Sequence, residues 1–168
     1  MKISISRIVP GMFKGLVLLA AGIAGGLSAS SSADAAVLSQ GSLCFPAYGT
    51  PHGDVDRING WTVSRNARIM VDCPVTVDHS ISSPVYFKAA VQDSHSTQDF
   101  LCVGYVFNQQ GNVVTFTSNI TATGTGAKTL IGSVSVTPSA DYTYLLECEV
   151  PALSSSGSVS GIKVIKIL

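Results

Sequence analysis

Residues 142–151 read Tyr-Thr-Tyr-Leu-Leu-Glu-Cys-Glu-Val-Pro, and this stretch decides the fold class. Successive side chains on a strand point to opposite faces, so five of them share one apolar face: Tyr142, Tyr144, Leu146, Cys148 and Val150. The other face carries Thr143, Leu145, Glu147 and Glu149, which water tolerates. Pro151 cannot donate to a sheet ladder and ends the pattern. The stretch therefore predicts a half-buried strand with a cysteine on its buried face, and its two glutamates are interpreted as the solvent edge of a sheet.

The first 35 residues have the pattern of a secretory signal peptide. The basic start contains Lys2, Arg7 and Lys14. An uncharged, mostly apolar run covers 15–29, and Ala33-Asp34-Ala35 is a small-x-small cleavage site. The run is short for a membrane span of about 20 residues, although an uncleaved anchor is the alternative. We predict a signal peptide at 1–35 and one domain at 36–168, in a secreted or periplasmic protein that is not an integral membrane protein after cleavage.

Removal of this leader changes the charge balance. The 168-residue chain has ten basic and ten acidic residues, and the leader holds three of the bases and one of the acids. The remaining 133 residues therefore carry seven bases and nine acids, a net charge of −2. This balance, with no basic run, excludes a nucleic-acid partner. A chain of this size is large enough for one hydrophobic core.

All the cysteines follow the leader, at Cys44, Cys73, Cys102 and Cys148. An even number of cysteines in an exported chain predicts disulfides. Zinc is not predicted, because the sequence has no C-x-x-C motif and no nearby Cys/His pair. Four cysteines allow three pairings, and among them we predict neighbours in order, Cys44 with Cys73 and Cys102 with Cys148. Each bridge would constrain the unfolded chain by about 3–4 kcal/mol in the chain-entropy model.

Short alternating stretches recur along the chain and predict strands at 42–45, 61–63, 67–73, 84–92, 100–107, 113–117, 128–137, 142–151 and 161–168. Pro74 is expected to interrupt its strand, 119–126 to form a loop, and Asn59-Gly60 to form a turn. No helical periodicity occurs after the leader. The fold class is therefore all-β, an antiparallel two-sheet sandwich of about seven to nine strands, immunoglobulin-like or jelly-roll in outline.

The stretch 100–107 is apolar on both of its faces. One face carries Phe100, Cys102 and Val106, and the other carries Leu101, Val103, Tyr105 and Phe107. An exposed apolar stripe on a monomer usually marks an interaction site, so the second set is our candidate interface. The alternative is that the long segment 45–66 covers it.

The candidates for catalysis are weak. His52 lies near Asp54, His79 follows Asp78, and His95 lies near Asp99. A hydrolase would need such a pair beside a nucleophilic serine, and no serine lies in G-x-S-x-G. We therefore predict no catalytic residue and no cofactor.

Two oxygen-rich segments are candidates for calcium. Segment 54–60 begins like a calcium loop, but its glycine is one place late and no closing glutamate follows. Segment 93–99 gathers further oxygen atoms, and turn formation by Asp and Asn explains both segments without an ion. We predict no metal site.

Carbohydrate would be bound by aromatic rings, for which Trp61, Tyr48, Tyr86 and Tyr105 are candidates. Tyr86 and Tyr105 would share a face if their strands paired. Trp61 is more simply explained as a core residue.

Three short motifs carry a resemblance: Cys44-Phe45-Pro46, Cys73-Pro74 and Tyr144-x-x-x-Cys148-x-x-Pro151. Over most of 42–168 the chain resembles small exported bacterial proteins, usually uncharacterised, with a two-disulfide β-sandwich pattern. The resemblance implies a disulfide-bonded sandwich and no activity. We expect a non-enzymatic exported protein with a structural, adhesive or surface-binding role, whose partner is another protein or a cell-surface glycan. The alternative is a carbohydrate-binding or hydrolytic secreted domain.

Overall fold

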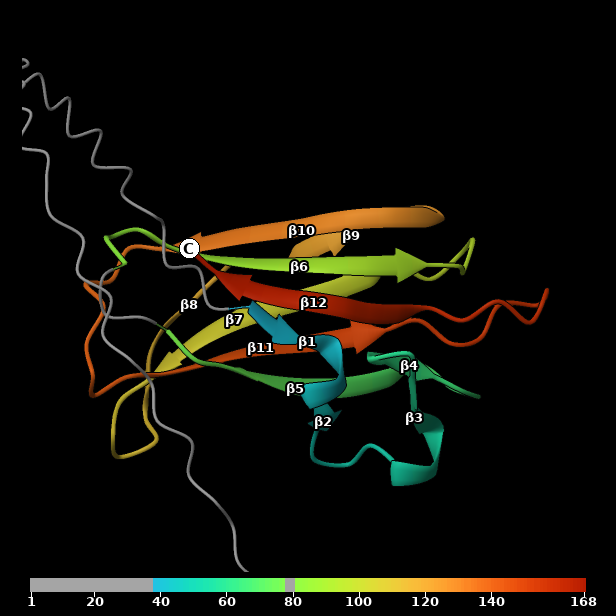
Figure 1. The fold of residues 1–168 in the computed structure, drawn as a ribbon, viewed down its shortest axis with the longest axis horizontal. Helices are drawn as coiled ribbons and strands as arrows, with labels where there is room; N and C mark the ends of the chain where they lie inside the picture. The colour runs from blue at the N-terminus through green and yellow to red at the C-terminus, as the bar shows by residue number, and fades with distance from the viewer. Residues whose placement is uncertain (1–37, 78–80) are drawn as a thin grey trace, which may run out of the picture. The chain divides into compact units, whose positions relative to one another are not determined.

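The computed structural model describes residues 38–77 and 81–168, which form two antiparallel sheets (Figure 1). The first, called the β6 sheet, runs in the order β10 (Gly126–Val134), β6 (Val85–Asp93), β12 (Gly161–Ile167), β4 (Trp61–Ser64) and β3 (Val55–Ile58), with β1 (Leu38–Gln40) also paired to β12. The second, called the β7 sheet, runs in the order β2 (Phe45–Pro46), β5 (Ile69–Val75), β11 (Thr143–Val150), β7 (Phe100–Phe107) and β8 (Val113–Phe116), with β9 (Ile120–Ala122) also paired to β7. Two short 3₁₀ turns, η1 (Gly41–Leu43) and η2 (His52–Asp54), complete the described elements.

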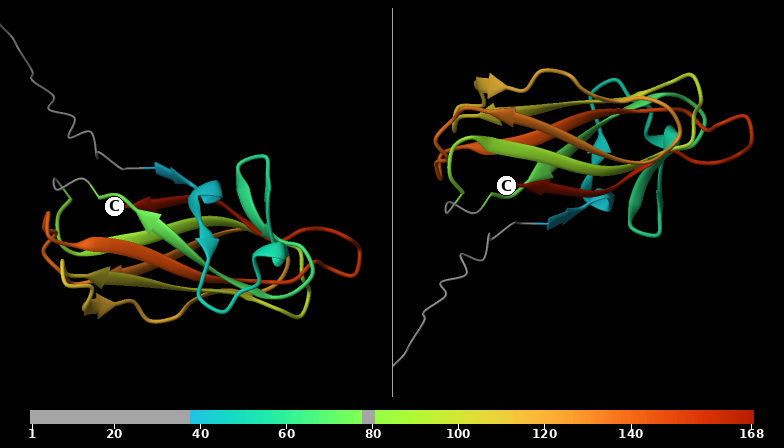
Figure 2. Two further views of the ribbon diagram at one scale, coloured as in Figure 1. Left: turned by 90° about the horizontal axis from the view of Figure 1, so that it is seen from below. Right: turned by 90° about the horizontal axis from the view of Figure 1, so that it is seen from above.

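The two sheets pack face to face, and Figure 2 shows the layers edge-on. The core lies between them, because every second residue of the long strands is buried. Phe87 of β6 and Gly104 of β7 show how closely the layers approach: a Cβ atom added to Gly104 would lie 2.5 Å from Cγ of the Phe87 ring. The prediction of an all-β, two-sheet antiparallel sandwich is confirmed.

Strand β11 is the half-buried strand that its alternation predicted, and it lies in the middle of the β7 sheet. It pairs with β5 on one side and β7 on the other, and Tyr144, Leu146, Cys148 and Val150 are all buried. Central strands bury one complete face, which is why the period of two is so clear in this stretch.

The predicted disulfide pairing is confirmed, since Cys44 is bonded to Cys73 and Cys102 to Cys148. Cys102 and Cys148 lie directly opposite each other on β7 and β11. Cys44 precedes β2, the strand that pairs with the cysteine-bearing strand β5. Both bonds therefore lie within the β7 sheet and its N-terminal approach, whereas the immunoglobulin bridge joins the two sheets. Such bonds place the protein in an oxidising, extracytoplasmic compartment.

Several strand boundaries differ from the prediction. Pro74 was expected to interrupt its strand, but β5 continues through it to Val75. On the side of β5 that faces β2, the pairing stops at Asp72, so no partner needs the N–H that Pro74 lacks. The segment predicted as a loop at 119–126 contains β9 and the start of β10. Strand β3 pairs with β4 across the predicted Asn59-Gly60 turn, where both residues have positive φ. With β1, these short strands raise the described number to twelve, above the predicted seven to nine.

The predicted signal peptide at 1–35 and His79 lie outside the described residues. No helix among the described residues is long and apolar enough to cross a membrane.

Candidate functional site

The outer face of the β7 sheet carries the predicted apolar stripe. Leu101, Val103, Tyr105 and Phe107 alternate with the buried side chains of β7 and are all half-buried. Tyr105 lies opposite Phe116 of β8, and their ring centroids are 6.1 Å apart. Phe107 stacks on Tyr105 at 5.9 Å. The stripe is thus extended by a third ring, Phe116, whose side chain is 62% exposed.

The strands of segment 45–66 lie away from this stripe. Strand β2 pairs with β5, which is separated from β7 by β11, whereas β3 and β4 belong to the other sheet. The rings of Tyr105, Phe107 and Phe116 therefore form an aromatic cluster at the β7–β8 end of the sheet.

Two carboxylates lie beside this cluster. Sequence reasoning did not identify them as a pair. Asp72 of β5 is directly opposite Glu147 of β11, and Glu147 is opposite Val103 of β7. The Oδ1 atom of Asp72 is buried and accepts no hydrogen bond from the described residues. The alternation at 69–75 places Asp72 on the outer face, but only the strand register shows which residue it meets.

The surroundings of this acidic pair shift three pKa values. Burial raises the pKa of Asp72 above its ordinary value. Burial, followed by the charge of Asp72, raises the pKa of Glu147. Burial, then the charges of Glu147 and Asp72, raises the pKa of the Tyr105 hydroxyl. Glu149 differs, because Arg68 pairs with it at 2.5 Å. The outer face of the β7 sheet thus combines an aromatic cluster with two adjacent carboxylates that no described cation neutralises.

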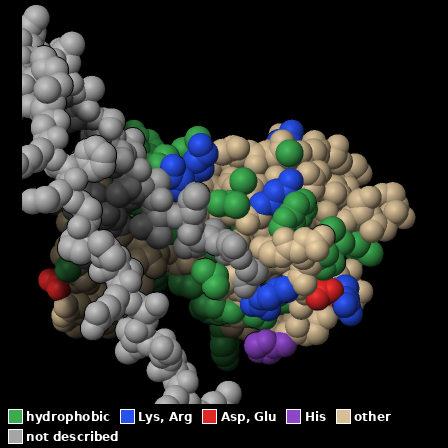
Figure 3. All heavy atoms as spheres, viewed as in Figure 1, with side chains coloured by type: hydrophobic (Ala, Val, Ile, Leu, Met, Phe, Trp, Pro, Cys, Tyr) green, Lys and Arg blue, Asp and Glu red, His purple; other side chains and the backbone are tan. Residues whose placement is uncertain are grey.

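The outer face of the β6 sheet carries the opposite charge. Lys88 of β6 and Lys166 of β12 are directly opposite each other in the ladder. Figure 3, viewed as Figure 1, shows lysine and arginine side chains among hydrophobic ones over β6 and β12. Tyr86, Val164 and Ile131 are exposed hydrophobic side chains of this sheet.

The predicted aromatic candidates do not gather at one site. Tyr86 and Tyr105 lie on different sheets, so their strands do not pair and the condition for a shared face is not met. Trp61 is half-buried on β4, with the Lys163 ammonium 4.2 Å from its ring centroid. Tyr48 is fully exposed in the loop after β2. The aromatic groups that do cluster are the rings at the β7–β8 end, and the strand pairing that joins them is long-range.

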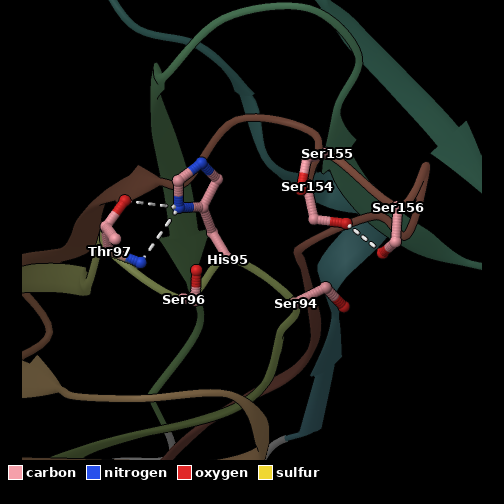
Figure 4. Close-up of a pocket in the computed structure, with 7 residues that line it drawn as sticks. All are labelled: Ser94, His95, Ser96, Thr97, Ser154, Ser155 and Ser156. Atoms are coloured by element: carbon pink, nitrogen blue, oxygen red, sulfur yellow. Dashed lines mark hydrogen bonds between the residues drawn. The ribbon is translucent and has the colours of Figure 1, made fainter.

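A polar hollow of about 410 Å³ lies between two loops at one end of the sandwich (Figure 4). It is lined by Ser94, His95, Ser96, Thr97, Ser154, Ser155 and Ser156. In Figure 4 the His95 ring stands on one side of the hollow and the 154–156 serines on the other. The serine loop is held internally, since the Oγ atoms of Ser154 and Ser156 are 2.8 Å apart.

The hydrogen bonds of His95 fix its tautomer. Its Nδ1 atom accepts from the backbone N–H groups of Thr97 at 3.3 Å and Gln98 at 3.1 Å, so Nδ1 carries no proton. The neutral ring then carries its proton on Nε2. A histidine that takes a proton from serine through Nε2 needs a protonated Nδ1 held by a carboxylate, which is the reverse arrangement. His95 in this tautomer caps a turn and can donate one hydrogen bond from Nε2.

Asp99 does not join His95 in the hollow. It lies outside the lining residues, and its Oδ1 atom accepts from the backbone N–H of Gly124 at 3.4 Å. The carboxylate that does hold the His95 loop is Asp93, which is fully buried and accepts from the His95 backbone N–H at 2.9 Å. Ser94 ties the same loop to the last connection, because its Oγ donates to the carbonyl of Val159 at 2.9 Å.

The remaining candidates are spread over the surface. His52 is exposed in η2. Within the proposed calcium segment, Asp56 pairs with Arg65 at 2.7 Å, and this hydrogen bond lowers the pKa of its carboxyl. Among the described residues, no group of three or more His, Cys, Asp or Glu side chains is placed to hold a metal ion.

Comparison with protein-family models, with curated proteins and with solved structures finds no match to this chain.

Proposed function

We propose that this is an exported protein, released by cleavage of its leader, with a structural, adhesive or surface-binding role. The outer face of the β7 sheet is its binding surface, and the partner is another protein or a cell-surface glycan. The observation that carries the proposal is the aromatic cluster of Tyr105, Phe107 and Phe116 beside the Asp72–Glu147 pair. Aromatic side chains bury large areas and are enriched at recognition surfaces.

Two features of this face are unfavourable in the isolated protein and would be relieved by a partner. Phe116 is largely exposed to water, although an aromatic side chain gains free energy on burial. Asp72 and Glu147 face each other with like charges, which destabilises the sheet pair. Both costs fall if a partner covers the rings and offers a cation to the carboxylates.

The alternative, a hydrolytic domain, would use His95 and the serines around it. The tautomer of His95 weighs against that alternative, because its acceptor nitrogen is occupied by two backbone N–H groups. In this tautomer the Nε2–H group of His95 can still donate one hydrogen bond into the hollow. A hydroxylated ligand bound there would need such a donor.

A binding experiment with matched variants tests the proposal. The full chain is expressed in a secreting host, purified oxidised, and applied to intact cells and to a glycan array. The variant Tyr105→Ser with Phe116→Ser should lose binding, whereas Tyr48→Ser, an equally drastic change at a fully exposed loop tyrosine, should retain it. Binding that survives the double variant and is lost with Tyr48→Ser would assign the function to the loop and overturn the proposal.

A further inference from the structure

Two cross-strand pairs of like charge stand on opposite outer faces of the sandwich. Asp72 faces Glu147 on the β7 sheet, and Lys88 faces Lys166 on the β6 sheet. Like charges directly opposite each other on one face of a sheet are unfavourable. Each pair therefore weakens its own sheet, and each has the charge that the other lacks.

Apolar side chains surround both pairs. Next to the acidic pair, Met70 precedes Asp72 by one outward position on β5 and Leu145 precedes Glu147 by one on β11. Met70 is 40% exposed. Next to the basic pair, Tyr86 and Val164 stand one outward position from Lys88 and Lys166, with exposures of 40% and 36%. Both faces thus have a charged pair within an apolar surround, and charges of opposite sign on two such faces can fix the partner and the register of a contact.

We propose that the protein assembles head to tail, with the β6-sheet face of one copy bound to the β7-sheet face of the next. This inference rests on the proposed function, because it names a second copy of the chain as a partner for the same face. In the contact, Lys88 and Lys166 of one copy neutralise Asp72 and Glu147 of the other. Because the two surfaces differ, the contact is heterologous and leaves one face of each type free at the ends. Such contacts build open chains unless their rotation closes a ring.

The other charged groups on these faces are accounted for locally. On the β7 sheet, Glu149 is paired with Arg68, and Tyr105 is the remaining titratable group facing the acidic pair. The sequences of β2, β8 and β9 contain no charged residue. On the β6 sheet, Lys163 lies over the Trp61 ring and Asp56 of β3 is paired with Arg65. Arg57 of β3 donates to the carbonyl of Cys44 at 2.5 Å, and Lys128 lies on the side of β10 that buries Leu130. The Asp72–Glu147 and Lys88–Lys166 pairs are therefore the charges that the faces offer to each other.

The contact should depend on salt and pH in a defined direction. Salt screens charge pairs, so association should weaken as ionic strength rises. The carboxyl pKa values of Asp72 and Glu147 are raised by burial, so these groups take up protons at a higher pH than usual. Acidification through that window removes the negative charges and should dissociate the chains.

Charge reversal on each face gives a decisive test by analytical ultracentrifugation. The oxidised protein, exported from the full chain, should form concentration-dependent species larger than a monomer at low salt. The variants D72K/E147K and K88E/K166E should each stay monomeric, with association weakened at least ~tenfold, because both faces of each variant then carry the same sign. An equal mixture of the two variants should associate again, because each face of one meets its complement on the other.

The control K128E reverses a lysine on the side of β10 that buries Leu130, so it leaves the charges of the contact face in place and should associate like the unaltered protein. A monomeric unaltered protein at low salt and high concentration would overturn the inference, as would a mixture of the two reversed variants that stays monomeric. If the protein stays monomeric yet binds cells through Tyr105 and Phe116, the proposed function stands and only the assembly fails. The D72K/E147K variant changes the face that both proposals use, so its loss of cell binding would not separate them. Cell binding is therefore measured on K88E/K166E, which keeps the β7-sheet face intact.

Discussion

Replacing Glu147 by glutamine should stabilise the folded protein at neutral pH. Glu147 lies directly opposite Asp72, and the Oδ1 atom of Asp72 is buried without a donor among the described residues. A glutamine has nearly the same shape, removes one negative charge and adds an amide N–H that can donate to Asp72. Cross-strand charge pairs change sheet stability by about 0.2–1 kcal/mol, and the buried oxygen places this pair in the upper half of that range. For a domain of this size, such a gain raises Tm by about 2–4 °C.

The gain should depend on pH with a sign fixed by the raised pKa values. A carboxyl with a raised pKa in the folded state binds its proton more tightly there than in the unfolded chain. Its ionised form therefore lowers stability at neutral pH, and this cost disappears as the pH falls through the folded pKa towards the ordinary values of 3.8 for Asp72 and 4.5 for Glu147. The advantage of Glu147→Gln should shrink over that window and be nearly absent at its lower end. The carboxyl of Asp56 behaves in the opposite way, because its pKa is lowered chiefly by the hydrogen bond from Arg65. Its contribution to the stability of the fold is lost only when the pH falls further.

Urea unfolding of the oxidised protein, followed by tryptophan fluorescence, measures this difference. Urea carries no charge and does not screen the pair, and dilute protein in moderate salt suppresses association. Glu149→Gln is the matched control, because it removes a glutamate from the same strand face but breaks the ion pair with Arg68, so stability should stay level or fall slightly. An equal gain for both glutamines, or a gain at Glu147 that persists unchanged at low pH, would refute the explanation by like-charge repulsion.

Three further variants test the packing of the layers, one disulfide bridge and one turn. Gly104→Ala should cost about 1–3 kcal/mol in urea unfolding, because its Cβ would meet the buried Phe87 ring, and a neutral result would mean that the layers can separate locally. Replacing Cys102 and Cys148 together by alanine should cost about 4 kcal/mol for a bridge spanning 46 residues, so an unchanged unfolding midpoint would contradict the constraint. Gly60→Ala should cost about 1–2 kcal/mol, since its φ is 82°, and thermal unfolding that matches the parent would place the turn in another conformation.

The long strands and the disulfides could be predicted from the sequence because their signals are local. Alternation at 144–150 is the direct consequence of burying one face of β11, and the same rule located β6 and β7. The cysteine count predicted two disulfides, whereas pairing in order was one of three possibilities and is established only by the folded structure. Fold class therefore followed from side-chain periodicity and cysteine count.

The short elements could not be predicted in the same way. Strands β1, β3 and β9 have only three or four residues each, too few for alternation to distinguish them from loops. Pro74 read as an interruption because the local rule ignores whether a neighbouring strand needs its missing N–H. Strand β2 pairs with only part of β5, so on that side no neighbouring strand needs the N–H that Pro74 lacks. This depends on how the strands pair and cannot be recognised from the proline alone.

The candidate site depends on register, which connects residues far apart in the chain. Leu101, Val103, Tyr105 and Phe107 were visible as a stripe because they share one strand. Asp72 and Glu147 became a pair only when β5 and β11 were aligned, and a shift of one residue would have turned either side chain into the core.

Like-charge pairs are therefore informative about function when they lie on an ordered face. Replacing Glu147 or Lys166 by a neutral residue would remove the repulsion, since nothing in the described sheets depends on it. One such pair stands on each outer face, with opposite signs, and each lowers the stability of its own sheet. A partner that brings the two faces together turns both costs into attraction, and the stability gained by Glu147→Gln should then be matched by weaker association. Measuring unfolding and association on that single variant tests the connection between the two.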